Sequence, residues 1–327
     1  MVISRVHIIK YGLICLYILG VGISMLIGDE IWSISRLVGV FFSTESEVGV
    51  HKSILFDVRL PRIIMAILIG MLLASCGCVT QSIFANPIAD PYIIGIASAA
   101  TFGAVVAYAI GLADFYFGIL GFVFCAAFSL LIFKLHKYAN ITTLLIIGIA
   151  ISSFLGALTS LFIYYIGESS FKIVAWLMGY LGLSSWDKVG ILCIPLILCM
   201  LYFYMYRYEM NIILSGDEEA RNLGVDATRL KRNLLIVSSF GVAFSVAFSG
   251  LIGFVGLVIP HIVRLLLKDY NNAIVLPLCT ALGGIFLLFC DGIARSALNV
   301  ELPIGIITAF FGVPLFLYLA LYARRSI

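Results

Sequence analysis

Residues 60–83 read LPRIIMAILIGMLLASCGCVTQSI, and no charged side chain follows Arg62 within this stretch. The hydrocarbon core of a bilayer is about 30 Å thick, so a helix needs roughly 20 apolar residues to cross it. Backbone N–H and C=O groups cannot stay unpaired in hydrocarbon, so a crossing segment is either a helix or a strand of a closed barrel. Barrel strands alternate apolar and polar residues over about 10 positions. This block is continuously apolar and much longer, which predicts a transmembrane helix.

Blocks of the same kind recur along the whole chain. Hydrophobic residues make up 63% of the sequence and charged residues 11%, against about 45–50% and about 25% in soluble domains. We therefore predict an all-α fold, a polytopic transmembrane bundle of about ten spans. No long linker or soluble domain interrupts it, so residues 1–327 are expected to form one transmembrane domain. The spans are expected at 10–28, 60–83, 92–110, 115–134, 141–166, 189–206, 233–250, 257–268, 273–295 and 302–323.

Two of these blocks are unusual. The first follows Arg5 and Lys10 and resembles a signal peptide, but it lacks a small-x-small cleavage site, which favours an uncleaved first helix. The block at 257–268 is too short to cross a bilayer and follows the glycine-rich run that begins at Gly250. Non-helical backbone at that depth is tolerated only inside protein or along a cavity. We expect the bundle to open onto a pathway there.

The distribution of Lys and Arg predicts the orientation, because loops on the cytoplasmic side are enriched in these residues. With the N-terminus in the cytoplasm, thirteen basic residues fall inside and seven outside. Both termini are therefore expected to be cytoplasmic. The inner set is Arg5, Lys10, Lys134, Lys137, Arg207, Arg221, Arg229, Lys231, Arg232, Arg264, Lys268, Arg324 and Arg325. The outer set is Arg36, Lys52, Arg59, Arg62, Lys172, Lys188 and Arg295.

Several kinds of chemistry are disfavoured by the sequence. Cys76 and Cys78 are the only closely spaced cysteines, and a spacing of two places them on different faces of a helix. Small buried side chains are favoured over a metal or redox site. The G-x-S-x-G and H-E-x-x-H patterns of intramembrane proteases are absent, as is the G-x-x-x-x-G-K-[ST] phosphate loop. We expect no metal, no cofactor bound by this chain and no nucleic-acid partner; any ATP and Mg would bind a separate ATPase.

The loop at about 207–232 carries more structure signals than a connector needs. Ser215 and Glu218 have the spacing of a capping box, and acidic residues near them favour a helix N-terminus. Gly224 suits the residue after a helix, and Asp226 suits the cap of a second short helix. One alternative is a solvated connector. A connector needs only a few residues, so the pattern favours a docking element for a cytoplasmic partner.

Six motifs then point to one family. Glu219-Ala220 followed by Gly224 resembles the E-A-x-x-x-G signature of ATP-binding-cassette importer permeases. Five further segments resemble the permeases for iron chelates and cobalamin, in chain order. They are RLPR at 59–62, NPIADP at 86–91 followed by Gly95, WLMG at 176–179, GFVGLVIPHIVR at 253–264 and ELPIG at 301–305.

The resemblance implies ten helices per subunit, two permease subunits around a central pathway, and an ATPase dimer beneath them. The second subunit is a copy of this chain or a related one. The resemblance also implies a soluble substrate-binding protein that delivers the cargo from outside, and a location in a bacterial inner membrane. The family's cargoes favour a ferric siderophore, then haem, then cobalamin, with occasional oxyanions such as molybdate. The alternative is an ion-driven secondary transporter, which would need acidic residues within spans; Asp90 and Asp291 lie near helix ends.

The resemblance also assigns roles by position. In the loop, ATPase coupling falls to Asp217, Glu218, Glu219, Ala220, Arg221 and Gly224. On the outer side, Arg59, Arg62 and Arg295 would form salt bridges to carboxylates of the binding protein, because guanidinium pairs with carboxylate in bidentate fashion. Interfacial snorkelling is the alternative for these three. Asp291 and Arg295 are one helical turn apart, so they are also able to neutralise each other.

An inner gate and a supporting pair complete the assignment. The gate and pathway residues implied by the resemblance are Asn86, Pro87, Asn140, Thr142, Thr143 and Met178. Tight turns are the alternative at Asn86-Pro87 and at 140–143, because proline stops a helix. His261 and Arg264 are expected to play a supporting role near the ATPase interface.

Overall fold

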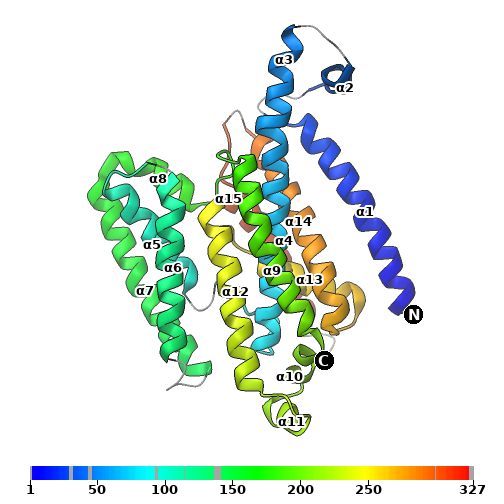
Figure 1. The fold of residues 1–327 in the computed structure, drawn as a ribbon, viewed down its shortest axis with the longest axis vertical. Helices are drawn as coiled ribbons and strands as arrows, with labels where there is room; N and C mark the ends of the chain where they lie inside the picture. Colours follow the sequence, from blue (N-terminus) through cyan, green and yellow to red (C-terminus); the bar gives the residue numbers. More distant parts are fainter. Residues whose placement is uncertain are drawn as a thin grey trace.

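The computed structural model describes residues 2–28, 32–42, 46–92, 95–113, 115–135, 141–298 and 300–323. These residues form helices joined by short loops, and no strand occurs among them. The long helices run roughly side by side (Figure 1). In chain order the elements are α1 (Val2–Leu26), α2 (Ile34–Phe42), α3 (Ser46–Ser53), the π-helix η1 (Ile54–Arg59), α4 (Leu60–Ile83), α5 (Ile96–Ala109), α6 (Phe115–Leu135), α7 (Ile141–Ile166), the 3-10 helix η2 (Gly167–Ser170), α8 (Phe171–Leu177), α9 (Trp186–Met205), α10 (Arg207–Leu214), α11 (Asp217–Asn222), α12 (Ala227–Ser249), α13 (Val255–Leu267), α14 (Asn272–Ser296) and α15 (Ile304–Ala323).

Each predicted span coincides with a helix. Six helical stretches are long and apolar enough to cross a membrane, and four shorter apolar helices accompany them. The bounds predicted for 60–83 match α4, whereas α5 starts at Ile96 rather than at 92. Its start is delayed because Gly95 adopts a left-handed conformation, with φ of 91°. The all-α, polytopic transmembrane bundle is confirmed for the described part of the chain.

The centre of the bundle is α4, which packs against α9, α12, α13 and α14. Small residues let neighbouring backbones approach closely, which is how membrane helices gain packing without a hydrophobic driving force. A Cβ on Gly70 would overlap the carbonyl of Gly283 in α14, and a Cβ on Gly77 would overlap that of Gly256 in α13. Glycine is required at these crossings because any side chain would push the helices apart.

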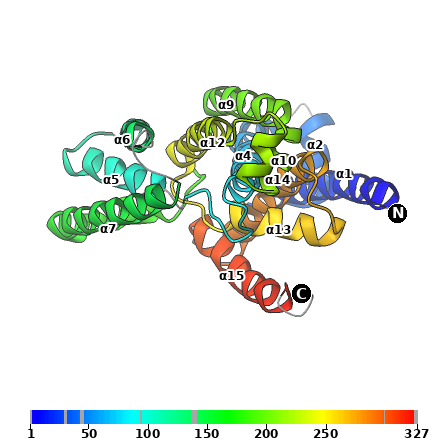
Figure 2. The ribbon, with the colours of Figure 1, turned by 90° about the horizontal axis from the view of Figure 1, so that it is seen from below.

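Two groups of helices flank this centre on opposite sides (Figure 2). On one side, α5 packs against α6 and α7, and α6 contacts α12. The α6–α12 contact is aromatic, with the rings of Phe122 and Phe244 4.6 Å apart. On the other side α1 leans against α14 and leaves much of its own surface exposed (Figure 1).

The start of α1 and the end of α15 lie in the lower half of the molecule, toward α11, as Figure 1 shows. The segment with α2 and α3 lies at the opposite end. We refer to the end with α11 as the inner end and to the end with α3 as the outer end. That the inner end faces the cytoplasm stays a prediction from the charge distribution.

Candidate functional site

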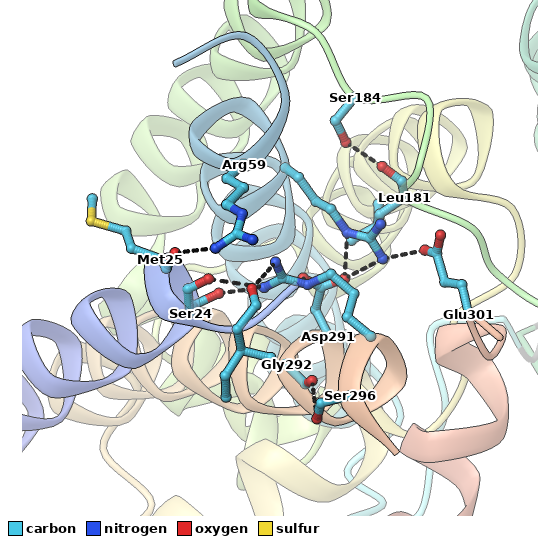
Figure 3. Close-up of polar contacts among 12 residues, drawn as sticks. Ser24, Met25, Arg59, Leu181, Ser184, Asp291, Gly292, Ser296 and Glu301 are labelled. Atoms are coloured by element: carbon cyan, nitrogen blue, oxygen red, sulfur yellow. Dashed lines mark hydrogen bonds and ion pairs between the residues drawn. The ribbon is translucent and has the colours of Figure 1, made fainter. Parts of the chain in front are cut away.

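Three arginines meet at the outer end, and each is less than a tenth exposed. Arg59 is the last residue of η1, Arg62 lies in the first turn of α4, and Arg295 lies in the last turn of α14. Figure 3 shows Arg59, Asp291 and Glu301 around this cluster. Burying a cation costs free energy unless the cation is paired. The partners of the three arginines therefore determine whether the cluster stabilises the fold.

Asp291, which is fully buried in α14, is the central partner. The Nε of Arg62 donates to Asp291 Oδ1 over 3.0 Å, and the Nη2 of Arg62 lies 2.9 Å from the same oxygen. On the other side, the Nε of Arg295 lies 2.9 Å from Asp291 Oδ2. This second pair lacks hydrogen-bond alignment, so it is held by charge rather than by a directed bond. One carboxylate is therefore shared by two guanidinium groups.

Backbone and neighbouring side chains complete the cluster. Arg62 also forms an ion pair with Glu301, which lies in the segment before α15. Arg295 Nη1 donates to the Ile27 carbonyl over 2.8 Å, and its Nη2 to Ser24 Oγ over 2.5 Å. Together these contacts fasten α1, α4, α14 and the segment before α15 to one another at the outer end.

Arg59 joins the cluster to the outer segment. Its Nη1 donates to the Met25 carbonyl over 2.6 Å, and its guanidinium carbon lies 4.1 Å from the ring centroid of Trp32. Trp32 is itself buried. A guanidinium over an indole face is attracted by the ring quadrupole, so Arg59 holds the chain after α1 against η1.

These contacts change the sequence-based view of the arginines. Snorkelling toward water is wrong for Arg59, Arg62 and Arg295, because all three are buried. The neutralising pair of Asp291 and Arg295 is confirmed. Docking to a binding protein stays a prediction, and it now requires that protein's carboxylates to exchange with internal partners.

At the inner end, α10 and α11 form a small knob, in which α10 packs against α4 and α14 and α11 carries the exposed side chains. Asp217, Glu218 and Glu219 occupy the first turn of α11 and face solvent, whereas Ala220 is fully buried against the bundle. Arg221 is exposed as well. This difference in burial explains the Glu219-Ala220 pair. Ala220 packs α11 against the bundle, and Glu219 is exposed to solvent.

The end of α11 is a glycine stop. Gly224 has φ of 79°, and its N–H donates to the Arg221 carbonyl over 3.0 Å. The N–H of Val225 donates to the Ala220 carbonyl over 2.8 Å. This pair of bonds is the Schellman arrangement. It favours glycine after the helix because glycine has no Cβ and so adopts the left-handed conformation without a clash. The predicted role of Gly224 in ending the helix is confirmed.

Two local predictions in this loop are wrong. Ser215 does not cap α11, because Gly216, with φ of 115°, occupies the cap position and Ser215 ends α10. Asp226 does act as a cap, accepting from Arg229 N over 2.9 Å. The helix that it starts, however, is the long α12 and not a second short helix. The second short helix of the knob is α10, which precedes α11.

Asn86 and Pro87, two of the predicted gate residues, lie in the loop after α4 at the inner end. Asn86 and Pro87 are exposed after α4, and the Asn86 side chain accepts from Ile88 N over 3.0 Å, which makes a tight turn. Thr143 is exposed in the first turn of α7. Asn140 and the side chain of Thr142 lie outside the described residues. The tight-turn alternative at Asn86 is confirmed, and a gate there stays a prediction.

The same loop holds a half-buried acid, Asp90. The Asp90 side chain accepts from Tyr92 N over 2.7 Å. Burial raises the pKa of Asp90 to about 6, an effect that this backbone hydrogen bond only partly offsets. Asp90 lies between α4 and α5.

Met178 lies apart from the other gate residues, at a junction of three helix breaks. Its carbonyl accepts from Gly305 N at the start of α15 over 2.9 Å, and Tyr180 N donates to Ser249 O at the end of α12 over 2.8 Å. A Cβ on Gly305 would overlap the Met178 carbonyl. Backbone that leaves a helix within a membrane must find protein partners, and here the breaks pair with one another.

The break before α13 belongs to the same region. Phe254 takes a left-handed conformation, with φ of 67°, at the cap of α13. Its ring lies against Gly312 of α15, where a Cβ would crowd it. The non-helical backbone expected before this short helix is confirmed at 250–254, whereas an opening onto a pathway there stays a prediction.

The two supporting residues have different surroundings. Arg264 is buried and contacts α4, where its guanidinium pairs with the Gln81 amide oxygen and its Nη2 donates to the Cys78 carbonyl over 3.4 Å. It therefore stabilises the α4–α13 packing from inside the bundle, and its expected position near an ATPase stays a prediction. His261 is half-buried in α13, and its role stays a prediction.

Comparison with known proteins decides the family. The model of the FecCD transport family matches residues 16–322. The chain belongs to the FecCD transport family. It is therefore an importer permease of the ATP-binding-cassette class, a transport subunit rather than an enzyme, and a multi-pass membrane protein.

Relatives of this FecCD permease carry different cargo names. The cobalamin import permease BtuC of Halobacterium salinarum is 40% identical over 86% of this chain and 77% of its own length. The molybdate import permease MolB of Haemophilus influenzae is 35% identical over 97% of this chain and 96% of its own. An inward-facing solved structure of a metal-chelate type ABC transporter is 34% identical, with a TM-score of 0.84 over 95% of this chain and 98% of that one. The cargo therefore has to be argued separately.

Sequence reasoning missed several residues of this FecCD permease. Glu301 was singled out only within a motif, and its ion pair with Arg62 could not be foreseen from the spacing. Gly250 and Gly305 also matter, because a side chain at either would meet the carbonyl of Trp176 or Met178. The signal was present in the second case, since Gly305 closes the ELPIG motif.

Proposed function

We propose that this chain is the membrane subunit of an importer that moves an iron chelate across the inner membrane of a bacterium into the cytoplasm. A ferric siderophore is the first choice of cargo, followed by haem and cobalamin. The FecCD membership carries the proposal. The likeness to a metal-chelate type transporter supports a chelate, and the cobalamin permease relative supports keeping cobalamin among the candidates.

The knob at the inner end is the proposed contact with a separate ATPase dimer. Asp217, Glu218 and Glu219 are exposed on one short helix, and Ala220 and Gly224 fix how that helix is held. Lys231 of α12 forms an ion pair with Asp217, with Nζ and Oδ1 2.6 Å apart. A displacement of α11 by the ATPase would therefore be transmitted to α12 through this ion pair. ATP and Mg would bind the ATPase, with no cofactor on this chain.

The arginine cluster is the proposed docking site for the substrate-binding protein. Arg62 pairs with both Asp291 and Glu301, and Arg295 pairs with Asp291. Glu301 is the more accessible acid, with its side chain 24% exposed, whereas Asp291 is fully buried. A carboxylate of the binding protein would replace Glu301 at Arg62 at little cost, because the ion pair is exchanged rather than lost.

A second permease subunit is the proposed neighbour of α7 and α15, which lie along one side of the molecule (Figure 2). Large apolar side chains are exposed on both helices, including Phe154 and Leu161 of α7 and Phe310 and Leu317 of α15. Either a copy of this chain or a related chain would cover them, and the pathway would run between the two subunits.

The proposal is tested by ATPase activity of the complex reconstituted from the permease, its ATPase and its binding protein. The binding protein is loaded in turn with ferric siderophore, haem, cobalamin and molybdate. Stimulation by the ferric siderophore form is expected. Stimulation by another loaded form alone would identify that compound as the cargo instead. No stimulation by any form, together with no ATPase co-purifying with the permease, would favour the ion-driven transporter.

A further inference from the structure

A membrane-facing groove lies at the inner end between α1 and the rest of the bundle. It encloses about 740 Å³ and is lined by residues of α1, α4, α9 and α14. Most of the lining is apolar, with Met71, Leu201 and Ile274 as examples. The hydroxyl of Thr280, one of the few polar groups, is bonded to the Leu276 carbonyl over 2.9 Å. Figure 1 shows α1 leaning away from its neighbours on this side.

One cation lines the groove, and a second contacts one of its lining residues. Lys10 lines it from α1. Arg207, at the start of α10, stacks on the ring of Tyr204, another lining residue, with its guanidinium carbon 4.0 Å from the ring centroid. Arg207 also donates to the Tyr204 carbonyl over 2.6 Å. In the part of the chain that the structure describes, neither Lys10 nor Arg207 forms an ion pair with an acid.

A second apolar groove provides an internal contrast. It encloses about 610 Å³ between α6, α9 and α12, and it also contains one lysine, Lys188. The ammonium of Lys188, however, donates to the Leu183 carbonyl over 2.6 Å. The lining of this second groove also holds an acid, Asp187, which offsets the lysine, whereas no acid is among the described residues that line the first groove.

We propose that the groove beside α1 binds an anionic phospholipid, with its acyl chains along Met71, Leu201 and Ile274 and its phosphate held by Lys10 and Arg207. Basic pockets between transmembrane helices attract anionic headgroups, at about 1 kcal/mol for each Lys or Arg. An apolar groove open to the bilayer fills with lipid tails. The two cations, Lys10 and Arg207, then favour lipids with an anionic headgroup. Placing this lipid in the cytoplasmic leaflet rests on the proposed orientation, whereas its binding does not.

The test places a tryptophan reporter in the groove. The Leu201→Trp chain is reconstituted in bilayers of phosphatidylglycerol and phosphatidylcholine with matched chains, and one of the two lipids carries brominated chains that quench fluorescence. Trp32, Trp176 and Trp186 supply a background, which is measured on the chain without the reporter. Comparison of the two bilayers gives the preference for the anionic lipid at the groove.

The parent reporter chain is expected to prefer phosphatidylglycerol. Lys10→Gln and Arg207→Gln are each expected to lower that preference about fivefold, and Lys188→Gln to leave it unchanged. Equal quenching by both lipids in the parent would overturn the proposal. So would a preference that survives the Lys10→Gln, Arg207→Gln double substitution. Uptake of cargo does not enter this measurement, so its outcome is independent of the proposed transport function.

Discussion

Replacing Asp291 with asparagine removes the one charge that two buried arginines share. The side chain keeps its size, but Arg295 loses its acidic partner and Arg62 keeps only Glu301. Because the arginines come from α4 and α14, the change acts on the packing of these two helices at the outer end.

The size of the effect follows from the geometry. Nitrogen and oxygen atoms lie 2.9 Å apart in both pairs, which corresponds to about 6 kcal/mol of attraction per pair at an effective dielectric constant of about 20. Desolvation offsets most of this. Removing one member of a buried ion pair nevertheless costs about 3–5 kcal/mol, because a charge stays buried without compensation.

Thermal unfolding of the purified chain in detergent measures the loss, followed by tryptophan fluorescence. Asp291→Asn is expected to lower the Tm by about 5–10 °C. Glu301→Gln should lower it less, because Glu301 is partly exposed and has one arginine partner. The matched control is Asp187→Asn, an exposed acid in the first turn of α9. A Tm for Asp291→Asn equal to that of the control would refute the account of the cluster.

Three other predictions concern the remaining parts of the molecule. Glu219→Ala is expected to lower ATPase stimulation by loaded binding protein at least severalfold without a change in Tm, because Glu219 is exposed on α11; unchanged stimulation would contradict its coupling role. Gly305→Ala should destabilise the chain by about 1–3 kcal/mol, since its Cβ would overlap the Met178 carbonyl, and a Tm at the wild-type value would show that the junction tolerates a side chain. Asp90 has a pKa raised by burial to about 6, so ionisation destabilises the fold as pH rises from about 4 to 6. Asp90→Asn should therefore gain Tm relative to wild type across that window, and a constant difference would contradict the burial effect.

The spans could be predicted because the bilayer imposes them. Residues 60–83 had to form one helix, since backbone groups in hydrocarbon need internal partners, and α4 has those bounds. The start of α5 was less predictable, because it depends on the left-handed conformation of Gly95, which apolar composition does not reveal.

The sites could be predicted in part. Gly224 and Asp226 act locally, so their roles in ending and starting a helix were visible in the sequence. The prediction that Ser215 caps α11 was wrong, because Gly216 occupies the cap position. The pairing of Arg62 with Glu301 joins residues that are far apart in the chain, and only the packing of α4 against α14 brings them together.

The central claim is that import through this FecCD permease is powered by ATP hydrolysis on a separate ATPase. Uptake of radiolabelled ferric siderophore into proteoliposomes, containing the permease with its ATPase and supplied with loaded binding protein outside, tests it most directly. The account predicts uptake that requires ATP inside the vesicles and persists when a protonophore collapses the ion gradient. Uptake without ATP that the protonophore abolishes would contradict it.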